Sequence, residues 1–447
     1  DPCWIQYTFD APIVARSVHV IPAGNNFQAQ RLAVYASEDG IHFNEIKQLT
    51  PPRQGWQNTD EDFTYSIPAT KARYFRFYWD PAGTEPGAED LDAAKWRPNL
   101  RVNHIALSGE AVIDQYEGKT GLVWRVARRT QTDEIAAEAV VNPSEVIEIP
   151  LSSLTENRLS TTLPSGKWRI IRMGHTSTGH TNATGGAGRG LECDKFSKEA
   201  VRTQLDNWFG AAFRETDPVL ARKVLKYMHV DSWECGSQNW SENFREQFQQ
   251  RRGYDLTPHP LVYTGIPTGS VERTASIRYD MRQTIAELVV EVFYDTLAEF
   301  AKEHDCEFSA ECVSPTMVSD GMMHYRKVDR PMGEFWLDSP THDKFNDMLD
   351  AISGARVYGK NIIQGEGFTQ LRTLWNENPR TIKTLLDRNY ALGLNKLFHH
   401  VYVHNPFMDQ RPGVTLDGIG LYFQRDQTWW EQANAWSDYI KRCQTLL

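Results

Sequence analysis

The chain has 447 residues, a length that suggests two or three domains at about 150 residues each. With 48 Lys and Arg against 58 Asp and Glu, the formal net charge is −10, which argues against a nucleic-acid partner or an anionic membrane surface. The longest apolar stretches, such as residues 286–294, are short and carry glutamate, so the sequence predicts no membrane span. These properties indicate a globular chain with enough material for a large core.

Aromatic residues are numerous, with 14 Trp, 17 Tyr and 20 Phe, and many lie close to acids, amides or histidines. Pyranose rings stack on aromatic faces while their hydroxyls need hydrogen bonds, so this composition is compatible with a sugar-binding cleft. Large cores also bury many aromatic side chains, which leaves a purely structural interpretation open. The six cysteines show neither Cys-x-x-Cys pairs nor zinc spacing, so they predict no disulfide framework and no zinc site.

Residues 1–112 show short runs of alternating polar and apolar residues, separated by Pro, Gly, Asn and Asp. This pattern predicts a β-sandwich with strands near residues 17–21, 31–35, 74–78 and 102–107. A Ser-x-Asp-Gly turn and a later Arg-x-Phe-Arg strand resemble those of galactose-binding-like modules. Residues 113–165 are expected to form a β-rich connecting segment.

From residue 166 onward, strand-like runs alternate with long amphipathic helices, which predicts a parallel sheet with crossover helices. The expected fold is a (β/α)8-type barrel over residues 166–447, following the N-terminal β-sandwich. Only six βα units are visible, and their strands are expected near residues 168–173, 224–230, 306–310, 330–333, 360–364 and 396–402. We therefore expect an incomplete barrel whose first two strands lie upstream of this chain.

Four consecutive strands of this barrel are followed or ended by a glutamate, namely Glu234, Glu311, Glu334 and Glu366. In a (β/α)8 barrel the C-terminal strand ends open onto one face, so these side chains are expected to lie together. A cluster of like charges implies a carboxyl of raised pKa, a bound cation, or both. Glycoside hydrolysis is the chemistry that needs one protonated and one ionised carboxyl, and the sequence therefore favours a glycosidase.

A series of short motifs supports this interpretation: Arg172–His175, Gly190–Lys195, Asp231–Glu234 through Trp240, Arg252–Asp255, Gly365–Thr369, His400–His404 and Thr428–Trp430. Together they resemble glycoside hydrolase family 106, the α-L-rhamnosidases of bacterial pectin breakdown, over about residues 140–447. The resemblance implies a (β/α)8 barrel with β-sandwich modules, an inverting mechanism and a calcium ion near the bound rhamnose. It also implies a periplasmic or secreted location.

The resemblance implies that Glu234 is the general acid, and we predict that Glu334 is the base that activates water. Glu366 is the rival for the role of base. As calcium ligands, Glu311 and Glu366 are the candidates, because calcium prefers carboxylate and carbonyl oxygens. Further residues are expected to contact the sugar, namely His175, Asp231, Trp233, Trp240, Glu311, Trp336, Glu366, His400 and His404.

The sequence therefore predicts a glycoside hydrolase that removes terminal α-L-rhamnose from an oligosaccharide or polysaccharide, such as a pectic chain, by a single displacement. One alternative is a retaining barrel glycosidase that acts on another sugar through Glu234 and Glu366. The other is an inactive carbohydrate-binding protein. The sequence leaves the oligomeric state, the glycan and the linkage open.

Overall fold

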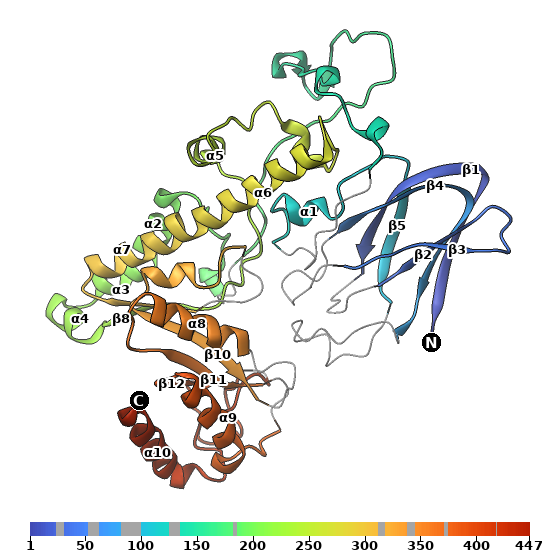
Figure 1. Cartoon of the computed structure of the whole chain (residues 1–447). Coiled ribbons are helices and arrows are strands. Elements are labelled where there is room, and N and C mark those ends of the chain that lie inside the picture. Colours follow the sequence, from blue (N-terminus) through green and yellow to red (C-terminus); the bar gives the residue numbers. More distant parts are fainter. Residues whose placement is uncertain are drawn as a thin grey trace.

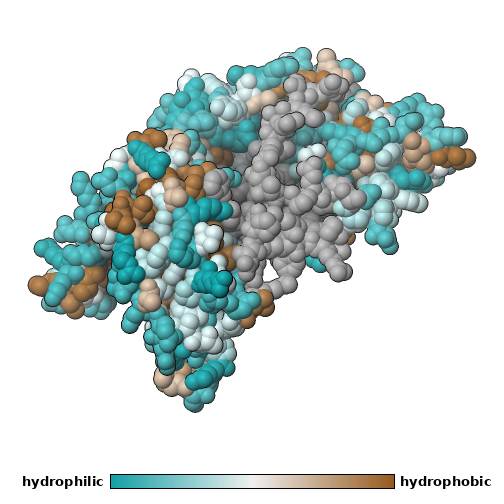
Figure 2. Space-filling model, turned by 60° about the horizontal axis from the view of Figure 1, so that its bottom comes forward, coloured by the Kyte–Doolittle hydropathy of each residue, from teal (hydrophilic) through white to brown (hydrophobic). Residues whose placement is uncertain are grey.

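The computed structural model describes residues 1–23, 31–51, 62–81, 100–124, 135–181, 186–311, 318–337, 345–370, 374–416 and 418–447. An N-terminal antiparallel sheet and a C-terminal α/β region make up these residues (Figure 1). The surface seen in Figure 2 is mostly hydrophilic, with its hydrophobic side chains in separate patches. In the described part of the chain, no helix combines the length and the apolar character that crossing a membrane requires.

The N-terminal sheet has the strand order β3-β2-β4-β1-β5. Its strands are β1 (Cys3–Pro22), β2 (Ala33–Ser37), β3 (Asn44–Gln48), β4 (Phe63–Trp79) and β5 (Val102–Ser108). Alternation along β4 buries Phe75 and Phe77 completely, while Arg76 between them points to the other face. The sandwich-like sheet expected from the sequence is confirmed, including strands at all four expected positions.

The segment at 113–165 is not β-rich, and that expectation is wrong for its described residues. It contains the short helix α1 (Tyr116–Lys119), three 3-10 turns (η3, Ala137–Ala139; η4, Pro143–Glu145; η5, Leu151–Ser153) and a small hairpin, β6 (Leu154–Thr155) with β7 (Arg158–Leu159). The alternating run at 146–149 lies between Pro143 and Pro150, and prolines cannot donate to a strand ladder. Its Ile147 is 44% exposed, so the alternation reflects no sheet face.

Glu117 anchors this segment to the N-terminal sheet. Its side chain is buried and accepts hydrogen bonds from the Thr64 hydroxyl at 2.5 Å and the Thr64 N–H at 3.2 Å. Burial raises the pKa of Glu117 to about 7, although the bonds from Thr64 oppose the shift. The carboxyl therefore favours its neutral form in the folded protein at mildly acidic pH.

Because the folded protein holds this proton more tightly than the unfolded chain, we expect stability to fall as pH rises from about 4.5 to about 7. Glu117→Gln should remove this slope, a difference on the order of 3 kcal/mol between the ends of the window. Denaturant unfolding at pH 4.5 and pH 8 measures it. The exposed Glu138→Gln is the matched control, and an unchanged slope in Glu117→Gln would contradict the assignment.

The C-terminal sheet is parallel, with the sequential order β12-β11-β10-β9-β8. Its strands are β8 (Tyr227–Val230), β9 (Glu307–Ala310), β10 (Arg330–Trp336), β11 (Gln364–Thr369) and β12 (Lys396–His399). They form a curled half-barrel, which confirms a partial (β/α) barrel. Four of the six expected strands are present at their expected positions, and β11 begins at residue 364, where the strand expected at 360–364 was to end. The run at 168–173 pairs with no described strand, and its Ile170 is 59% exposed, so that strand prediction is wrong.

Helices accompany this sheet and bury its apolar side chains: α2 (Lys198–Asn207), α3 (Phe209–Glu215), α4 (Pro218–Val224), α5 (Phe244–Arg252), α6 (Val271–Leu288), α7 (Asp295–Glu303), α8 (Phe345–Val357), α9 (Pro379–Leu392) and α10 (Ala433–Leu446). Ser197 caps α2 by accepting from the Ala200 N–H at 3.3 Å, as its sequence position predicts. A π-helical segment, Val289–Tyr294, joins α6 to α7, so the three segments form one continuous helix.

Candidate active site

Glycines and glutamates alternate within β10 and β11, and this alternation orients the carboxylates. Gly333 pairs with Gly365 and Glu334 pairs with Glu366 in the parallel register. A Cβ on Gly333 would lie 2.8 Å from the Asp347 carbonyl oxygen, because α8 packs directly against the strand there. Since successive strand residues point to opposite faces, Glu334 and Glu366 both project to the concave face, away from the helix.

The two carboxylates of this register pair have different surroundings. Glu334 is buried and accepts a hydrogen bond from the Trp336 indole N–H. Glu366 is half-buried, accepts from the Thr369 hydroxyl at 3.3 Å, and lies 3.7 Å from Nε2 of His400. Glu366 therefore has the more solvent-accessible carboxylate of the two.

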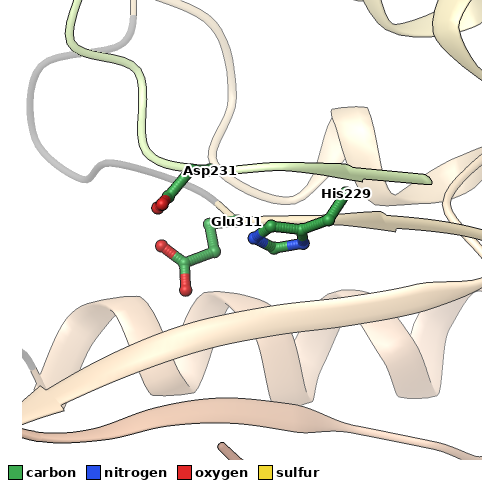
Figure 3. A group of neighbouring side chains, drawn as sticks. All are labelled: His229, Asp231 and Glu311. Atoms are coloured by element: carbon green, nitrogen blue, oxygen red, sulfur yellow. The ribbon is translucent and has the colours of Figure 1, made fainter. Parts of the chain in front are cut away.

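A second group of acids lies at the ends of β8 and β9, where His229, Asp231 and Glu311 point toward one another (Figure 3). Each offers one ligand atom, and these atoms lie within 4.8 Å of one another. His229 and Asp231 are exposed on the concave face, whereas Glu311 is buried. This triad brings two of the predicted substrate-binding residues together with a histidine that sequence reasoning missed.

The tautomer of His229 follows from a hydrogen-bond chain. The Ser309 hydroxyl donates to the Gln364 side-chain oxygen at 2.6 Å, so it can accept from Nδ1 of His229, 3.0 Å away. Nδ1 then carries the proton and Nε2 keeps its lone pair. Partial desolvation lowers the pKa of His229, which favours this neutral form. Its position two residues before Asp231 on one strand face is the sequence signal that could have identified it.

Glu311 and Asp231 titrate in opposite directions. Burial raises the pKa of Glu311 well above its ordinary value, and the negative charges of Glu366 and Glu334 add to the shift. For Asp231, partial desolvation by its neighbours would raise the pKa, but hydrogen bonds from the Glu311 side chain and the Ser232 N–H lower it. Three of the four carboxylates predicted to lie together, Glu311, Glu334 and Glu366, thus interact, and Asp231 takes the place expected for Glu234, which is exposed in the loop after β8. The proton of the Asp231–Glu311 pair resides on Glu311.

A cavity of about 330 Å³ lies beside the loop that follows β8. Its lining includes His175, whose ring stacks on that of Trp240 with centroids 6.0 Å apart. Trp233 also lines it, but this indole is 5% exposed and packs on Trp124, so it belongs mainly to the core. The structure therefore places these three predicted sugar contacts at the cavity and not within the carboxylate cluster.

The remaining predicted residues occupy loops. Glu234 is exposed in the loop after β8, between Trp233 and Cys235, both of which line the cavity. His404 is exposed in the loop after β12. Sequence reasoning missed the cavity residues Glu192 and Lys195, whose side chains form an ion pair at 2.6 Å, although the motif at 190–195 contains both.

The five described cysteines, Cys3, Cys193, Cys235, Cys306 and Cys443, are free thiols, and Cys312 lies outside the described residues. The buried Oε1 of Glu311 meets no N–H or O–H donor among the described residues. A proton shared with Asp231 or a bound cation would satisfy that oxygen, so the residues present fit a cation that takes carboxylate ligands.

A parallel half-barrel with carboxylates gathered on its concave face fits a (β/α)-barrel glycoside hydrolase. The chain belongs to glycoside hydrolase family 106: the family described as alpha-L-rhamnosidase matches residues 14–447. The family resemblance seen in the sequence motifs is thereby confirmed.

One relative of known structure carries a rhamnosidase name, whereas one curated relative carries the name of a different glycosidase. The rhamnosidase from Novosphingobium sp. PP1Y superposes with a TM-score of 0.79 at 28% identity, covering 99% of this chain and 41% of that chain. A Formosa agariphila protein named "Putative beta-glucuronidase" is 32% identical over 317 residues, which are 71% of this chain and 27% of that protein. This chain thus spans well under half of either relative. A pectin-binding module matches 24% of the chain with a TM-score of 0.18, too low to say what the N-terminal sheet binds.

Proposed function

We propose that the full-length gene product hydrolyses terminal α-L-rhamnosidic bonds by a single, inverting displacement, acting on a pectic polysaccharide or a related glycoside outside the cytoplasm. The observation that carries this proposal is the set of interacting carboxylates on the concave face of a family 106 half-barrel. Glu234 donates a proton to the glycosidic oxygen, and a second carboxylate activates water on the opposite face of the sugar.

Within this scheme we assign the base to Glu366 in preference to Glu334, the residue favoured by the sequence. A base must reach a water molecule, and Glu366 is half-buried beside His400. Glu334 is buried, with one oxygen already accepting from Trp336. We propose that Glu334 instead orients the sugar or adds negative charge that stabilises the oxocarbenium-like transition state.

A calcium ion fits the same proposal, with Asp231 and Glu311 as the ligands that this chain supplies. Glu366, the other ligand predicted from the sequence, is assigned to the base and not to the ion. When bound, calcium would neutralise these carboxylates and offer coordination positions to sugar hydroxyls. The imidazole of His229 is a poorer match to calcium, which prefers oxygen, and we assign it a hydrogen bond to the sugar or to Asp231.

Removal of divalent cations distinguishes between two explanations of the Asp231–Glu311 pair, a bound metal ion and a shared proton. We expect dialysis against a chelator to lower both the melting temperature and the activity, and added Ca²⁺ to restore both. Glu311→Gln should abolish the thermal response to Ca²⁺, because one charged ligand is lost. Identical melting temperatures with and without Ca²⁺ would contradict the metal and favour the shared proton.

Product analysis tests the proposed reaction itself. Incubation with aryl α-L-rhamnosides and aryl β-glucuronides, followed by NMR of the first sugar released, should show rhamnose with inverted anomeric configuration. The glucuronide serves as the competing substrate because one relative carries that name. Retention of configuration would favour the double displacement through Glu234 and Glu366, and absence of hydrolysis would favour a binding protein.

A further inference from the structure

Glu234 lies in a loop, Ser232–Ser241, that contains no helix or strand. A general acid must stay within hydrogen-bond reach of the leaving oxygen, so a loop that carries it needs support from elsewhere. Two segments far apart in the sequence contact this acid loop, namely residues 120–124 and residues 192–196.

The first segment holds the acid loop through Trp124. The Trp124 indole N–H donates to the Gln238 carbonyl at 3.1 Å, and its ring lies against the ring of Trp233 with centroids 4.8 Å apart. Trp124 is 6% exposed, so both contacts are sheltered from water. Since Trp233 directly precedes Glu234, the Trp124 ring fixes the backbone on the N-terminal side of the acid.

Neighbours of Trp124 extend this contact. The Ser237 hydroxyl donates to the Leu122 carbonyl at 2.6 Å, and the Asn239 amide donates to the Thr120 carbonyl at 3.3 Å. The same segment is tied to the N-terminal sheet through Glu117 and Thr64. The acid loop is thus connected by hydrogen bonds to the N-terminal unit of the chain.

The second segment holds the acid loop through Asp194. One carboxylate oxygen accepts from the Gln238 side-chain amide at 2.6 Å and from the Phe196 N–H at 2.9 Å, and the other accepts from the Ser241 hydroxyl at 2.6 Å. Gln238 in turn accepts from the Lys195 N–H at 3.1 Å. Charge-assisted bonds of this length are among the stronger hydrogen bonds in proteins.

We propose that Trp124 and Asp194 are positioning residues that clamp the acid loop from two sides and hold Glu234 at the leaving oxygen. This inference rests on the proposed function of Glu234. Trp124 belongs to the segment that follows the N-terminal sheet. On this proposal, that part of the chain therefore contributes to turnover by positioning Glu234.

The proposal is tested by how kcat depends on the leaving group of the substrate. Departure of a basic alcohol needs the proton from Glu234, whereas 2,4-dinitrophenolate leaves without it. A displaced acid should therefore lower kcat on p-methoxyphenyl α-L-rhamnoside and spare kcat on 2,4-dinitrophenyl α-L-rhamnoside. A general loss of folded protein would lower both equally.

The experiment compares Trp124→Phe and Asp194→Asn in the full-length gene product, with Glu234→Gln as the reference. Trp168→Phe and Asp217→Asn are matched controls. Trp168 donates a similar indole bond to the Pro164 carbonyl at 2.8 Å, and Asp217 accepts two backbone bonds at the start of α4. All five variants are assayed on both rhamnosides.

We expect Trp124→Phe and Asp194→Asn to lower kcat on the methoxyphenyl substrate by ~10- to 100-fold with little change on the dinitrophenyl substrate. Equal losses on both substrates, or activities like those of the controls, would overturn the clamp. If Glu234→Gln itself shows no leaving-group selectivity, the assignment of the acid fails and the clamp fails with it. Selectivity in Glu234→Gln without selectivity in the two clamp variants overturns the clamp alone.

Discussion

Replacing Glu234 by Gln is expected to lower kcat/KM on p-methoxyphenyl α-L-rhamnoside by ~10²- to 10⁴-fold, the range for loss of a general acid. The amide keeps the shape of the side chain and cannot deliver a proton to the glycosidic oxygen. Turnover of the dinitrophenyl substrate should change far less. The acidic limb of the pH profile should be retained in the variant, because the base is intact, while the alkaline limb disappears.

Glu242→Gln is the control for this change, because Glu242 lines the same cavity just beyond the acid loop. A loss below about a hundredfold on the poor leaving group would show that Glu234 is not the acid. Equal losses on both substrates would point to a binding defect in place of lost proton transfer.

Replacing Glu366 by Gln is expected to lower turnover by a similar ~10²- to 10⁴-fold on both substrates, because water activation is needed whatever group leaves. Glu334→Gln should lower turnover less, since the Trp336 indole already occupies one of its oxygens. Steady-state assays of both variants on both rhamnosides measure the difference.

The comparison of these two variants decides which carboxylate is the base. A larger loss in Glu334→Gln, uniform across leaving groups, would restore the assignment made from the sequence. His400→Gln offers a supporting measurement, because the imidazole lies 3.7 Å from Glu366 and its loss should shift the acidic limb of the pH profile.

Much of the fold could be predicted because it depends on local patterns. The alternation in β4 and the Ser197 cap of α2 depend only on residues that lie close together in the sequence. The acids of β8 to β11 were also predictable as a group, although only Asp231 and Glu311 directly follow a strand, while Glu334 and Glu366 lie within β10 and β11. Their mutual proximity follows from parallel strand order and needs no knowledge of side-chain contacts.

Other features depend on partners that lie far away in the sequence. The run at 168–173 alternates like a strand, yet a strand exists only where a neighbour accepts its hydrogen bonds. His229 joins the acids through Ser309 and Gln364, which are 80 and 135 positions along the chain. Tryptophan is a residue type that commonly contacts sugars, and only the packing of Trp233 on Trp124 shows that it belongs to the core.

The register between β10 and β11 also sets the distance between the backbones at Glu334 and Glu366. Backbones of adjacent strands lie about 4.8 Å apart, and side chains at paired positions run side by side. An inverting enzyme needs its two carboxyls roughly 6.5–9.5 Å apart to leave room for water. The register places the backbones of Glu334 and Glu366 closer together than this carboxyl separation, so it favours an acid from outside the pair, as in the assignment of Glu234. The paired Gly-Glu dipeptides thus separate the position of the base from that of the acid.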